Sequence, residues 1–359
     1  MSYKHQSILV IHTAFPGDII LSIPLLKAIS ETLTPLRLYV LTTPAGAEIL
    51  SNFEFISDII IYDKHRSEKG FLAFLKKSAF IRQTFPDISL AIIPHKSFRS
   101  ALLAYLSNIR YRVGFITPST SFYATLYNKR VARDRKAHEI QRNLKLLLPL
   151  IDKNKAALLK KFENDYIIPW SKDDKETVLN LLPKNFSFKK SIVISPCSNW
   201  NTKAWPVENF CLLAKLLIQN NYDLILISSN SKKDLIICSQ IESYVNSKKI
   251  SNLSGKTSFP QLSFLFSNMT LLVTNDSAPM HIGASHNKPL ISIFGATTPA
   301  LGFYPFSAKS KILETNLSCR PCGPHGRKTC PQKHFNCMRN ITPQMVYEEI
   351  IRLLKKEVD

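Results

Sequence analysis

The chain has 359 residues, 45% of them hydrophobic and 20% charged, with a formal net charge of +21. This composition excludes a disordered chain, and the length allows about two domains that each bury a core. The ten glycines form neither a G-x-G-x-x-G nor a G-x-x-x-x-G-K-[ST] pattern, which excludes the standard dinucleotide fingerprint and the P-loop.

The first half of the chain alternates short strands with helices. Residues 7–12 form a β-branched run typical of a buried parallel strand, and residues 18–33 have the apolar spacing of a helix. Further strands are predicted at 37–41, 56–62 and 88–93, and further helices at 45–52, 71–85, 98–107 and 137–150. This alternation predicts βαβ units and a mostly parallel sheet.

The same pattern restarts after Ile167-Ile168-Pro169-Trp170, which we interpret as a linker. Strands are predicted at 191–195, 223–228, 270–274 and 290–294, and helices at 207–220, 232–246, 259–268, 278–286 and 342–358. We therefore predict two doubly wound, Rossmann-like domains, residues 1–168 and 169–359. The second ends in a Cys-rich loop (319–337) and a terminal helix. Two such domains that face each other place a ligand at the carboxyl ends of their strands.

No targeting or membrane-spanning segment is predicted. The first residues lead straight into a strand-like run, and apolar runs such as 89–94 are far shorter than the ~18–20 residues needed to span a bilayer. We therefore expect a cytoplasmic protein. Seven Cys is an odd number for such a chain, which argues against a complete disulfide framework.

The positive charge is concentrated in one part of the chain. Between Lys64 and Lys161 there are 21 Lys and Arg against 5 Asp and Glu, which accounts for +16 of the +21. This favours a face that meets nucleic acid, an anionic membrane surface or a phosphorylated substrate, although a merely solvated surface is the alternative. Because no helix-turn-helix, zinc-finger or RNP signature is present, we do not expect nucleic acid as the partner.

A first candidate loop, residues 13–18, lies between the first predicted strand and helix. Gly17 allows a close turn there, and Asp18 lies at or next to the helix N-cap. In one interpretation Asp18 caps the helix. In the other, a carboxylate at the carboxyl end of a strand serves as a general base. The sequence leaves both open.

Two further loops have the residue types of a phosphate-binding site. In residues 195–206, Ser198 and Asn199 precede Lys203, and hydroxyl and amide groups with one point charge suit a phosphate, although such loops also cap helices. In residues 274–281, Asp276 and His281 lie at a helix N-terminus and offer an acceptor for ribose and donors for phosphate. A lone histidine at such a position is more often structural than a ligand contact, and His281 is open to both interpretations.

Four segments occur together in a recognisable order: Gly17-Asp18, Lys203-Ala204-Trp205-Pro206, Asn275-Asp276-Ser277-Ala278-Pro279-Met280-His281 and Phe294-Gly295-Ala296-Thr297-Thr298-Pro299. Over nearly the whole chain this set resembles the lipopolysaccharide heptosyltransferase family, glycosyltransferase family 9. The tail from Cys319-Arg320-Pro321-Cys322 to Cys337-Met338 resembles the type II enzymes of that family. The resemblance implies a GT-B fold and an inverting, metal-independent transfer of heptose from ADP-heptose to the inner core of lipid A–linked oligosaccharide.

The resemblance also implies roles for single residues. Asp18 would deprotonate the acceptor hydroxyl, and Lys203 would neutralise the charge that grows on the departing diphosphate. Asp276 would lie nearest adenosine and His281 nearer the diphosphate. The expected donor-binding set is Ser198, Asn199, Asp276, Ser277, Ala278, His281, Gly295 and Thr297. Acceptor contacts are expected from basic residues of the first half, and loop position selects Arg66, Lys96 and Arg99.

The sequence departs from the family pattern at three of these loop positions. Ala278 stands where Gly is common, Cys197 where a Pro-Gly turn is usual, and Pro16 is not the commonest residue before Gly17. None of these changes removes a proposed catalytic group. They leave open another nucleotide sugar as donor, or a different heptosyl step (I or III).

Four cysteines near the end, Cys319, Cys322, Cys330 and Cys337, have the spacing C-x2-C-x7-C-x6-C, with His325 and His334 nearby. This is close to structural zinc spacing, although the middle interval is short. The alternative is a set of reduced thiols that pack a surface loop.

Two other functions fit the architecture less well. A nucleotide-sugar epimerase would need additional acids and histidines, and a non-catalytic protein that binds anionic membranes would not need Asp18, Lys203 and Asp276. The expected partners are ADP-heptose, a lipid A–core acceptor and the anionic inner-membrane surface, with the protein peripheral on its cytoplasmic face. No cofactor is expected.

Overall fold

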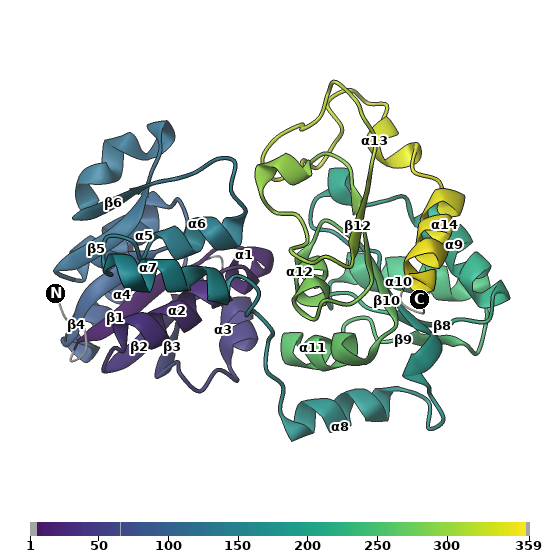
Figure 1. The fold of residues 1–359 in the computed structure, drawn as a ribbon, viewed down its shortest axis with the longest axis horizontal. Coiled ribbons are helices and arrows are strands. Elements are labelled where there is room, and N and C mark those ends of the chain that lie inside the picture. The colour runs from purple at the N-terminus through teal and green to yellow at the C-terminus, as the bar shows by residue number, and fades with distance from the viewer. Residues whose placement is uncertain (1–5, 65, 357–359) are drawn as a thin grey trace. The chain divides into compact units, whose positions relative to one another are not determined.

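Two six-stranded sheets, both built from parallel pairs, organise the chain (Figure 1). The computed structural model describes residues 6–64 and 66–356. The chain divides into two units, Met1–Ile168 and Pro169–Asp359, each with one sheet and its own helices. The predicted α/β class of two Rossmann-like halves is confirmed. The assignment of acceptor binding to one unit and donor binding to the other stays a prediction.

In the first unit the strand order is β3-β2-β1-β4-β5-β6. The strands are β1 (Ser7–His12), β2 (Arg37–Thr42), β3 (Asp58–Ile61), β4 (Ile88–Ile93), β5 (Tyr111–Ile116) and β6 (Lys129–Ala132). The sheet grows in one direction from β1 to β3 and in the other from β4 to β6. In open α/β sheets, ligands bind at the carboxyl ends of the strands where the order reverses, here beside β1 and β4.

The helices of the first unit are α1 (Pro16–Ile20), α2 (Ile23–Leu33), α3 (Pro44–Leu50), α4 (Phe71–Thr84), α5 (Phe98–Leu106), α6 (Glu139–Lys145) and α7 (Lys153–Leu158), with 3-10 turns η1 (Pro118–Leu126) and η2 (Leu159–Phe162). The single helix predicted over 18–33 is wrong. Pro24 has no N–H for a helix interior and lies instead in the first turn of a second helix, α2. The helix predicted over 137–150 is regular only in α6, with tight turns after it. The sequence pattern does not predict β5 or β6.

In the second unit the strand order is β12-β11-β10-β7-β8-β9. The strands are β7 (Ser191–Ser195), β8 (Asp223–Leu226), β9 (Ile250–Asn252), β10 (Leu271–Asn275), β11 (Leu290–Phe294) and β12 (Ser310–Glu314). The helices are α8 (Lys172–Leu181), α9 (Val207–Gln219), α10 (Lys232–Val245), α11 (Phe259–Asn268), α12 (Ala278–Ser285), α13 (Asn336–Arg339) and α14 (Pro343–Lys355), with 3-10 turns η3 (Phe188–Lys190), η4 (Asn201–Lys203) and η5 (Pro299–Leu301). The sequence pattern does not predict the short β9, the charged β12 or the polar α8. The terminal helix predicted over 342–358 is α14, and residues 357–359 lie outside the described part of the chain.

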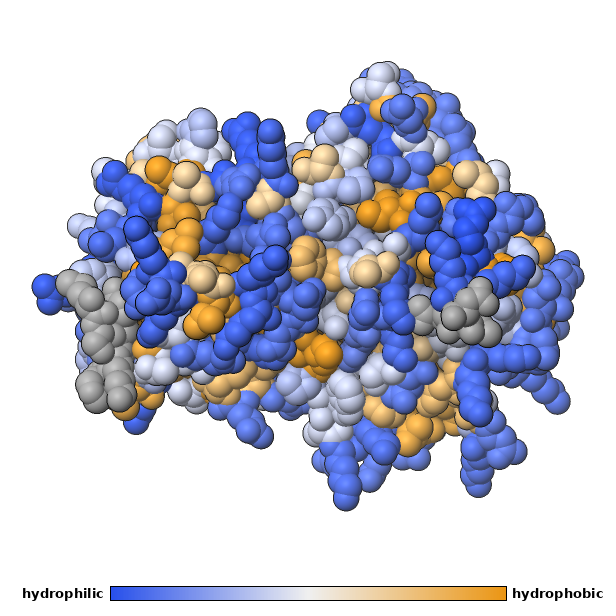
Figure 2. Space-filling model, in the orientation of Figure 1, coloured by the Kyte–Doolittle hydropathy of each residue, from blue (hydrophilic) through white to orange (hydrophobic). Residues whose placement is uncertain are grey.

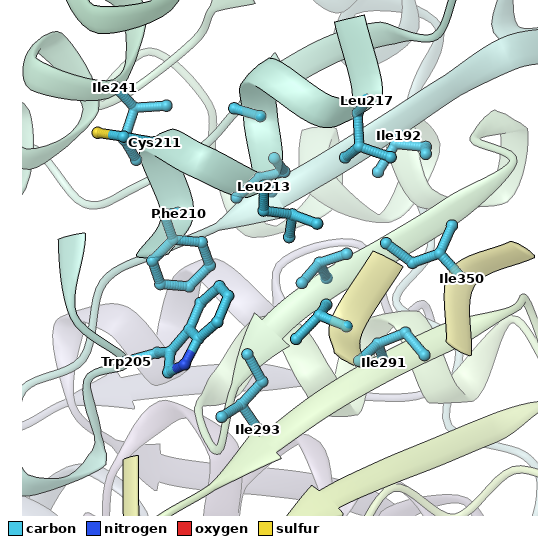
Figure 3. Close-up of a cluster of buried hydrophobic side chains, with 14 of the residues drawn as sticks. Ile192, Trp205, Phe210, Cys211, Leu213, Leu217, Ile241, Ile291, Ile293 and Ile350 are labelled. Atoms are coloured by element: carbon cyan, nitrogen blue, oxygen red, sulfur yellow. The ribbon is translucent and has the colours of Figure 1, made fainter. Parts of the chain in front are cut away.

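The core of the second unit encloses Trp205 (Figure 3). Its side chain is 2% exposed, its ring meets the edge of Phe210 at a centroid distance of 4.8 Å, and its Nε1–H donates to the Ile341 carbonyl at 2.9 Å. A buried indole that also has its hydrogen bond satisfied is held firmly in place. Because Lys203 is two residues earlier, this anchor holds the loop that carries Lys203.

Candidate functional site

Three loops of the second unit meet at the carboxyl edge of its sheet. β10 pairs in parallel with β7 on one side and with β11 on the other. The chain segments that leave these three strands, residues 196–206, 276–277 and 295–298, therefore emerge next to one another. They contain six of the eight predicted donor-binding residues, and the other two, Ala278 and His281, follow in α12 (Ala278–Ser285).

A buried ion pair lies at the centre of these loops. The Lys203 Nζ is 2.6 Å from Asp276 Oδ2, and their side chains are 14% and 7% exposed. The hydroxyl of Thr297 donates to the same Asp276 oxygen at 2.6 Å. The sequence-based hypothesis placed Lys203 at the diphosphate and Asp276 at adenosine, whereas the structure shows the two side chains in direct contact. This contact neutralises the carboxylate and orients the ammonium group at the sheet edge.

Asn275, the last residue of β10, holds the loop after β7 at two points. Its side-chain oxygen accepts from the Trp205 N–H at 3.0 Å, and its amide nitrogen donates to the Pro196 carbonyl at 2.8 Å. The side chain is fully buried, so both bonds are needed to satisfy it. The sequence analysis includes Asn275 in a family-like segment but assigns it no role. The available signal was an amide directly at the end of a buried strand, next to the acid.

The remaining donor-side residues lie along the same loops. Ser198 is half-buried and Asn199 is exposed in the loop after β7. Ser277 takes the N-cap position of α12, with its hydroxyl 3.3 Å from Thr274 Oγ1, and Ala278 is the first helical residue. His281 is 4% exposed within α12. Ser277 and Ala278 thus lie at the positive end of a helix, which favours an anion.

Gly295, directly after β11, has a packing requirement. A Cβ at this position would lie 2.7 Å from Met338 Cε and 2.9 Å from the Thr202 carbonyl oxygen. Because a backbone oxygen cannot move aside cheaply, only glycine allows this close approach. The Gly295 loop and the Lys203 loop are therefore in direct backbone contact.

In the first unit, Asp18 is the third residue of α1. The N-cap residue of this helix is Phe15, so Asp18 does not itself occupy the N-cap position but lies in the first turn of the helix. The Asp18 side chain is half-buried and lies in the first turn after β1. This is the position that the general-base hypothesis requires, at the carboxyl edge of the sheet beside the reversal point.

Two histidines and a lysine lie beneath the Asp18 loop. His12 Nδ1 is 3.0 Å from Ser22 Oγ, and its ring centroid is 5.2 Å from that of His95. The Lys64 ammonium donates to the Thr13 carbonyl at 2.6 Å. Burial, and then His95 and Lys64, hold the pKa of His12 well below its usual value, and burial with the charge of Lys64 lowers the pKa of His95 to about 3. Both imidazoles are therefore neutral at physiological pH.

The predicted acceptor residues occupy different surroundings. Arg66 and Lys96 are exposed. Arg99 donates through Nε to the Tyr62 hydroxyl at 2.8 Å and lies over the Phe74 ring at 5.2 Å, so it has structural partners already.

Lys96 belongs to a cationic group that sequence reasoning missed. Although Lys96 is largely exposed, partial burial lowers its pKa and the charge of Arg133 lowers it further. Glu139 opposes this shift, whereas Arg135 and Arg142 add to it. Glu139 pairs with Arg133 and with Arg142, which leaves more positive than negative charge in this group.

The cysteine-rich tail gives no support to a zinc site. Across residues 6–64 and 66–356, no group of three or more His, Cys, Asp or Glu side chains is arranged to hold a metal ion. All seven cysteines are free thiols. Burial, and then the neighbouring thiols, raise the pKa of Cys337 to about 11 and also raise that of Cys322. The zinc interpretation and the interpretation as reduced thiols that pack a loop both stay predictions.

Comparison with known proteins identifies the family. The model of "Glycosyltransferase family 9 (heptosyltransferase)" matches residues 87–336. The chain belongs to glycosyltransferase family 9. Its relatives include lipooligosaccharide heptosyltransferase 2 of Campylobacter jejuni (strain 81116), 25% identical over 340 residues that cover 94% of this chain and 96% of the relative. Lipopolysaccharide heptosyltransferase 2 of Salmonella typhimurium is 27% identical over 274 residues, 74% of this chain and 75% of the relative.

Solved structures agree with this assignment at the level of the fold. The structure of Escherichia coli ADP-heptose LPS heptosyltransferase II has a TM-score of 0.74 at 24% identity, over 98% of this chain and 100% of that one. A family 9 glycosyltransferase from Veillonella parvula has a TM-score of 0.83 at 19% identity, over 99% and 98%. The predicted GT-B fold of the family 9 enzyme is confirmed. Family membership favours a glycosyltransferase over the epimerase and the non-catalytic membrane-binding protein.

The histidines beneath the Asp18 loop predict a pH dependence of stability. The pKa of His12 is depressed in the folded state, so below about pH 6.5 the unfolded chain binds a proton that the folded chain does not. Stability is therefore fully present above that pH and falls as the pH drops, by ~1.4 kcal/mol per pH unit for each such histidine. In His12→Asn, urea unfolding measured from pH 7 to 5 should show a slope that is shallower by this amount.

The matched control is Ser22→Ala, which removes the hydroxyl 3.0 Å from His12 Nδ1 but no titratable group, and which should leave the slope of the wild type. A His12→Asn slope equal to that of the wild type would show that His12 takes up its proton equally in the folded and unfolded states, and would contradict the lowered pKa.

Proposed function

We propose that this family 9 glycosyltransferase transfers a heptose from ADP-heptose to the inner core of lipopolysaccharide, with inversion, as the second heptosyl addition. The observation that carries the proposal is the Lys203–Asp276–Thr297 group at the carboxyl edge of the second sheet. Its charges and hydroxyl suit a nucleotide diphosphate, and it lies in the motifs that resemble the family. Relatives named heptosyltransferase 2 and the type II resemblance of the tail support the choice of step.

The acceptor side of the proposed reaction depends on Asp18. Its carboxylate takes the proton of an acceptor hydroxyl as that oxygen attacks the anomeric carbon of heptose. The bond from this carbon to the β-phosphate oxygen breaks at the same time, ADP leaves with the electron pair, and the anomeric configuration inverts. One base and a stabilised leaving group are sufficient, without a covalent intermediate or a cofactor.

The donor side of the proposal uses the loops of the second unit. Lys203 neutralises the charge that develops on the departing diphosphate, a preorganised interaction of the kind that lowers reaction barriers most. Asp276 holds Lys203 in place and accepts from nucleotide hydroxyls. Ser198 and the backbone N–H groups at the start of α12 complete the phosphate contacts.

The first test is a turnover assay with the purified protein. ADP-heptose with a core acceptor that already carries its first heptose should give ADP and an extended product. UDP- and GDP-sugars serve as donor controls, and an acceptor without heptose serves as the control for the step. Turnover only with a UDP- or GDP-sugar would overturn the donor proposal, and turnover only with the heptose-free acceptor would assign the first heptosyl step.

The second test addresses the base. Asp18→Ala should lower kcat by about 10²–10⁴, the usual contribution of a general base, while ADP still binds with its normal affinity. ADP affinity is measured by calorimetry and kcat by product formation. Asp58→Ala, which removes an exposed acid at the start of β3 in the same unit, is the control and should retain turnover. Near-normal turnover of Asp18→Ala would show that Asp18 is not the base.

We further propose that the first unit docks on the anionic inner-membrane surface, where a lipid-linked acceptor is held. Large apolar side chains are exposed near the carboxyl edge of its sheet: Phe71 (68%) and Leu72 (74%) begin α4, Phe98 (46%) begins α5, and Phe122 (74%) lies in η1. The rings of Phe98 and Phe122 are 5.8 Å apart. We call Phe71, Leu72, Phe98 and Phe122 the apolar rim.

Cationic side chains surround the apolar rim. Arg99 donates to the Gly70 carbonyl, next to Phe71, and Arg66, Lys69 and Lys96 are exposed in the flanking loops. On the face drawn in Figure 2, apolar patches likewise lie among hydrophilic side chains over the first unit. Aromatic residues among Lys and Arg are typical of proteins that bind the surface of anionic bilayers. Within the described ranges, no helix is long and apolar enough to cross a membrane.

Binding to vesicles tests this docking. The wild type should bind phosphatidylglycerol vesicles but not phosphatidylcholine vesicles, and added NaCl should weaken binding because it screens the charges. Phe122→Ser should weaken binding about tenfold, the effect expected when one buried ring is lost. Leu179→Ser, at an exposed apolar position of α8 in the second unit, is the control. Binding that ignores salt, or that responds only to Leu179→Ser, would contradict the proposal.

A further inference from the structure

The segment between β12 and α13 lies against both donor-side loops (Figure 1, yellow-green before α13). We call residues 319–327 the tail segment. The Cys322 N–H donates to the Ala296 carbonyl at 2.8 Å, in the loop after β11. The Thr202 N–H donates to the Arg327 carbonyl at 3.1 Å, and the Arg327 N–H donates to the Thr202 hydroxyl at 2.7 Å. The tail segment thus links the loop that carries Thr297 to the loop that carries Lys203.

Arg320 is the main contact between the tail segment and the loop after β11. Its guanidinium donates to the carbonyls of Gly295 and Thr315, to the Thr297 carbonyl at 2.7 Å and to the Phe294 carbonyl at 3.3 Å. It also pairs with Glu314 at 2.8 Å, and its side chain is only 5% exposed. A planar guanidinium with five N–H donors can satisfy this many fixed acceptors at once, which the ammonium group of lysine cannot.

We propose that Arg320 is a positioning residue for nucleotide binding, acting through the Gly295–Thr297 backbone on the Asp276–Lys203 pair. The inference rests on the proposed function, in which this pair meets the diphosphate. The connection is continuous: Arg320 holds the Thr297 carbonyl, the Thr297 hydroxyl donates to Asp276, and Asp276 pairs with Lys203.

Close packing makes this loop sensitive to displacement. Gly295 lies so near the Thr202 carbonyl that a single added carbon would be 2.9 Å from it. On the other side, a Cβ at Gly326 of the tail segment would lie 3.1 Å from Lys203 Cγ. Without the guanidinium, the carbonyls of Gly295 and Thr297 lose their donors and the loop shifts to recover them. The Thr297 hydroxyl then no longer orients Asp276.

The test is ADP binding by calorimetry in Arg320→Lys. This variant keeps the positive charge but loses the planar guanidinium that donates to several carbonyls at once. We expect ADP to bind about tenfold more weakly than to the wild type, while the KM for the acceptor stays unchanged. The matched control is Arg112→Lys in the first unit, because Arg112 also donates to backbone carbonyls, those of Leu126 at 2.6 Å and Arg110 at 3.3 Å. Arg112→Lys should lower the melting temperature about as much as Arg320→Lys does, and it should leave the affinity for ADP unchanged.

A second variant keeps the inference testable if Arg320→Lys does not fold. Thr202→Val preserves shape and removes the hydroxyl that bonds to Arg327, so it should also weaken ADP binding with little loss of stability. Normal ADP affinity in Arg320→Lys and in Thr202→Val would overturn the positioning role. If the wild type itself does not bind ADP, the proposed donor is wrong, which is a different result from a variant that binds as well as the wild type.

Discussion

The buried ion pair between Lys203 and Asp276 is the interaction on which the rest of the donor side depends. Two charges removed from water are costly unless they meet in good geometry with further hydrogen bonds, and here the Thr297 hydroxyl supplies one such bond. Asn275 beneath the pair joins the ends of the Lys203 loop to β10. The pair therefore forms only when β7, β10 and β11 are neighbours in the folded sheet. The fold of this unit and the geometry of its candidate site therefore depend on the same strand order.

The candidate residues of the first unit also depend on which strands are neighbours, but their charges differ from those of the second unit. The carboxyl ends of β1 and β4 again carry the candidate groups, but the charge balance there is strongly positive. Buried His12 stays neutral beside Lys64. The Lys64 ammonium group can therefore donate to the Thr13 carbonyl without a second positive charge nearby that would repel it. The excess of +16 between Lys64 and Lys161 first suggested several anionic partners. Together with the exposed apolar rim, it favours an anionic lipid surface over nucleic acid.

The interpretation of the tail changes most when the structure is compared with the sequence. Its four cysteines have nearly the spacing of a zinc site, yet the described side chains form no group arranged to hold a metal ion. Arg320, directly after the first of these cysteines, makes the important contacts. It binds backbone carbonyl groups at the ends of β11 and β12. A spacing pattern cannot predict this role, because every residue has a backbone carbonyl and the partners of Arg320 therefore need no particular residue type.

The sequence by itself determined the two α/β halves, most of their elements and the loops that carry Asp18, Lys203 and Asp276, since these follow from local hydrophobic periodicity and from motifs at strand ends. It did not reveal the break before Pro24, the edge strands β6 and β9, or the helix α8, where the apolar signal is short or absent. Only the tertiary structure decided that Lys203 contacts Asp276, that Asn275 clasps the loop and that Arg320 supports it. These contacts join residues far apart in the chain, and their geometry depends on strand order, which periodicity does not specify.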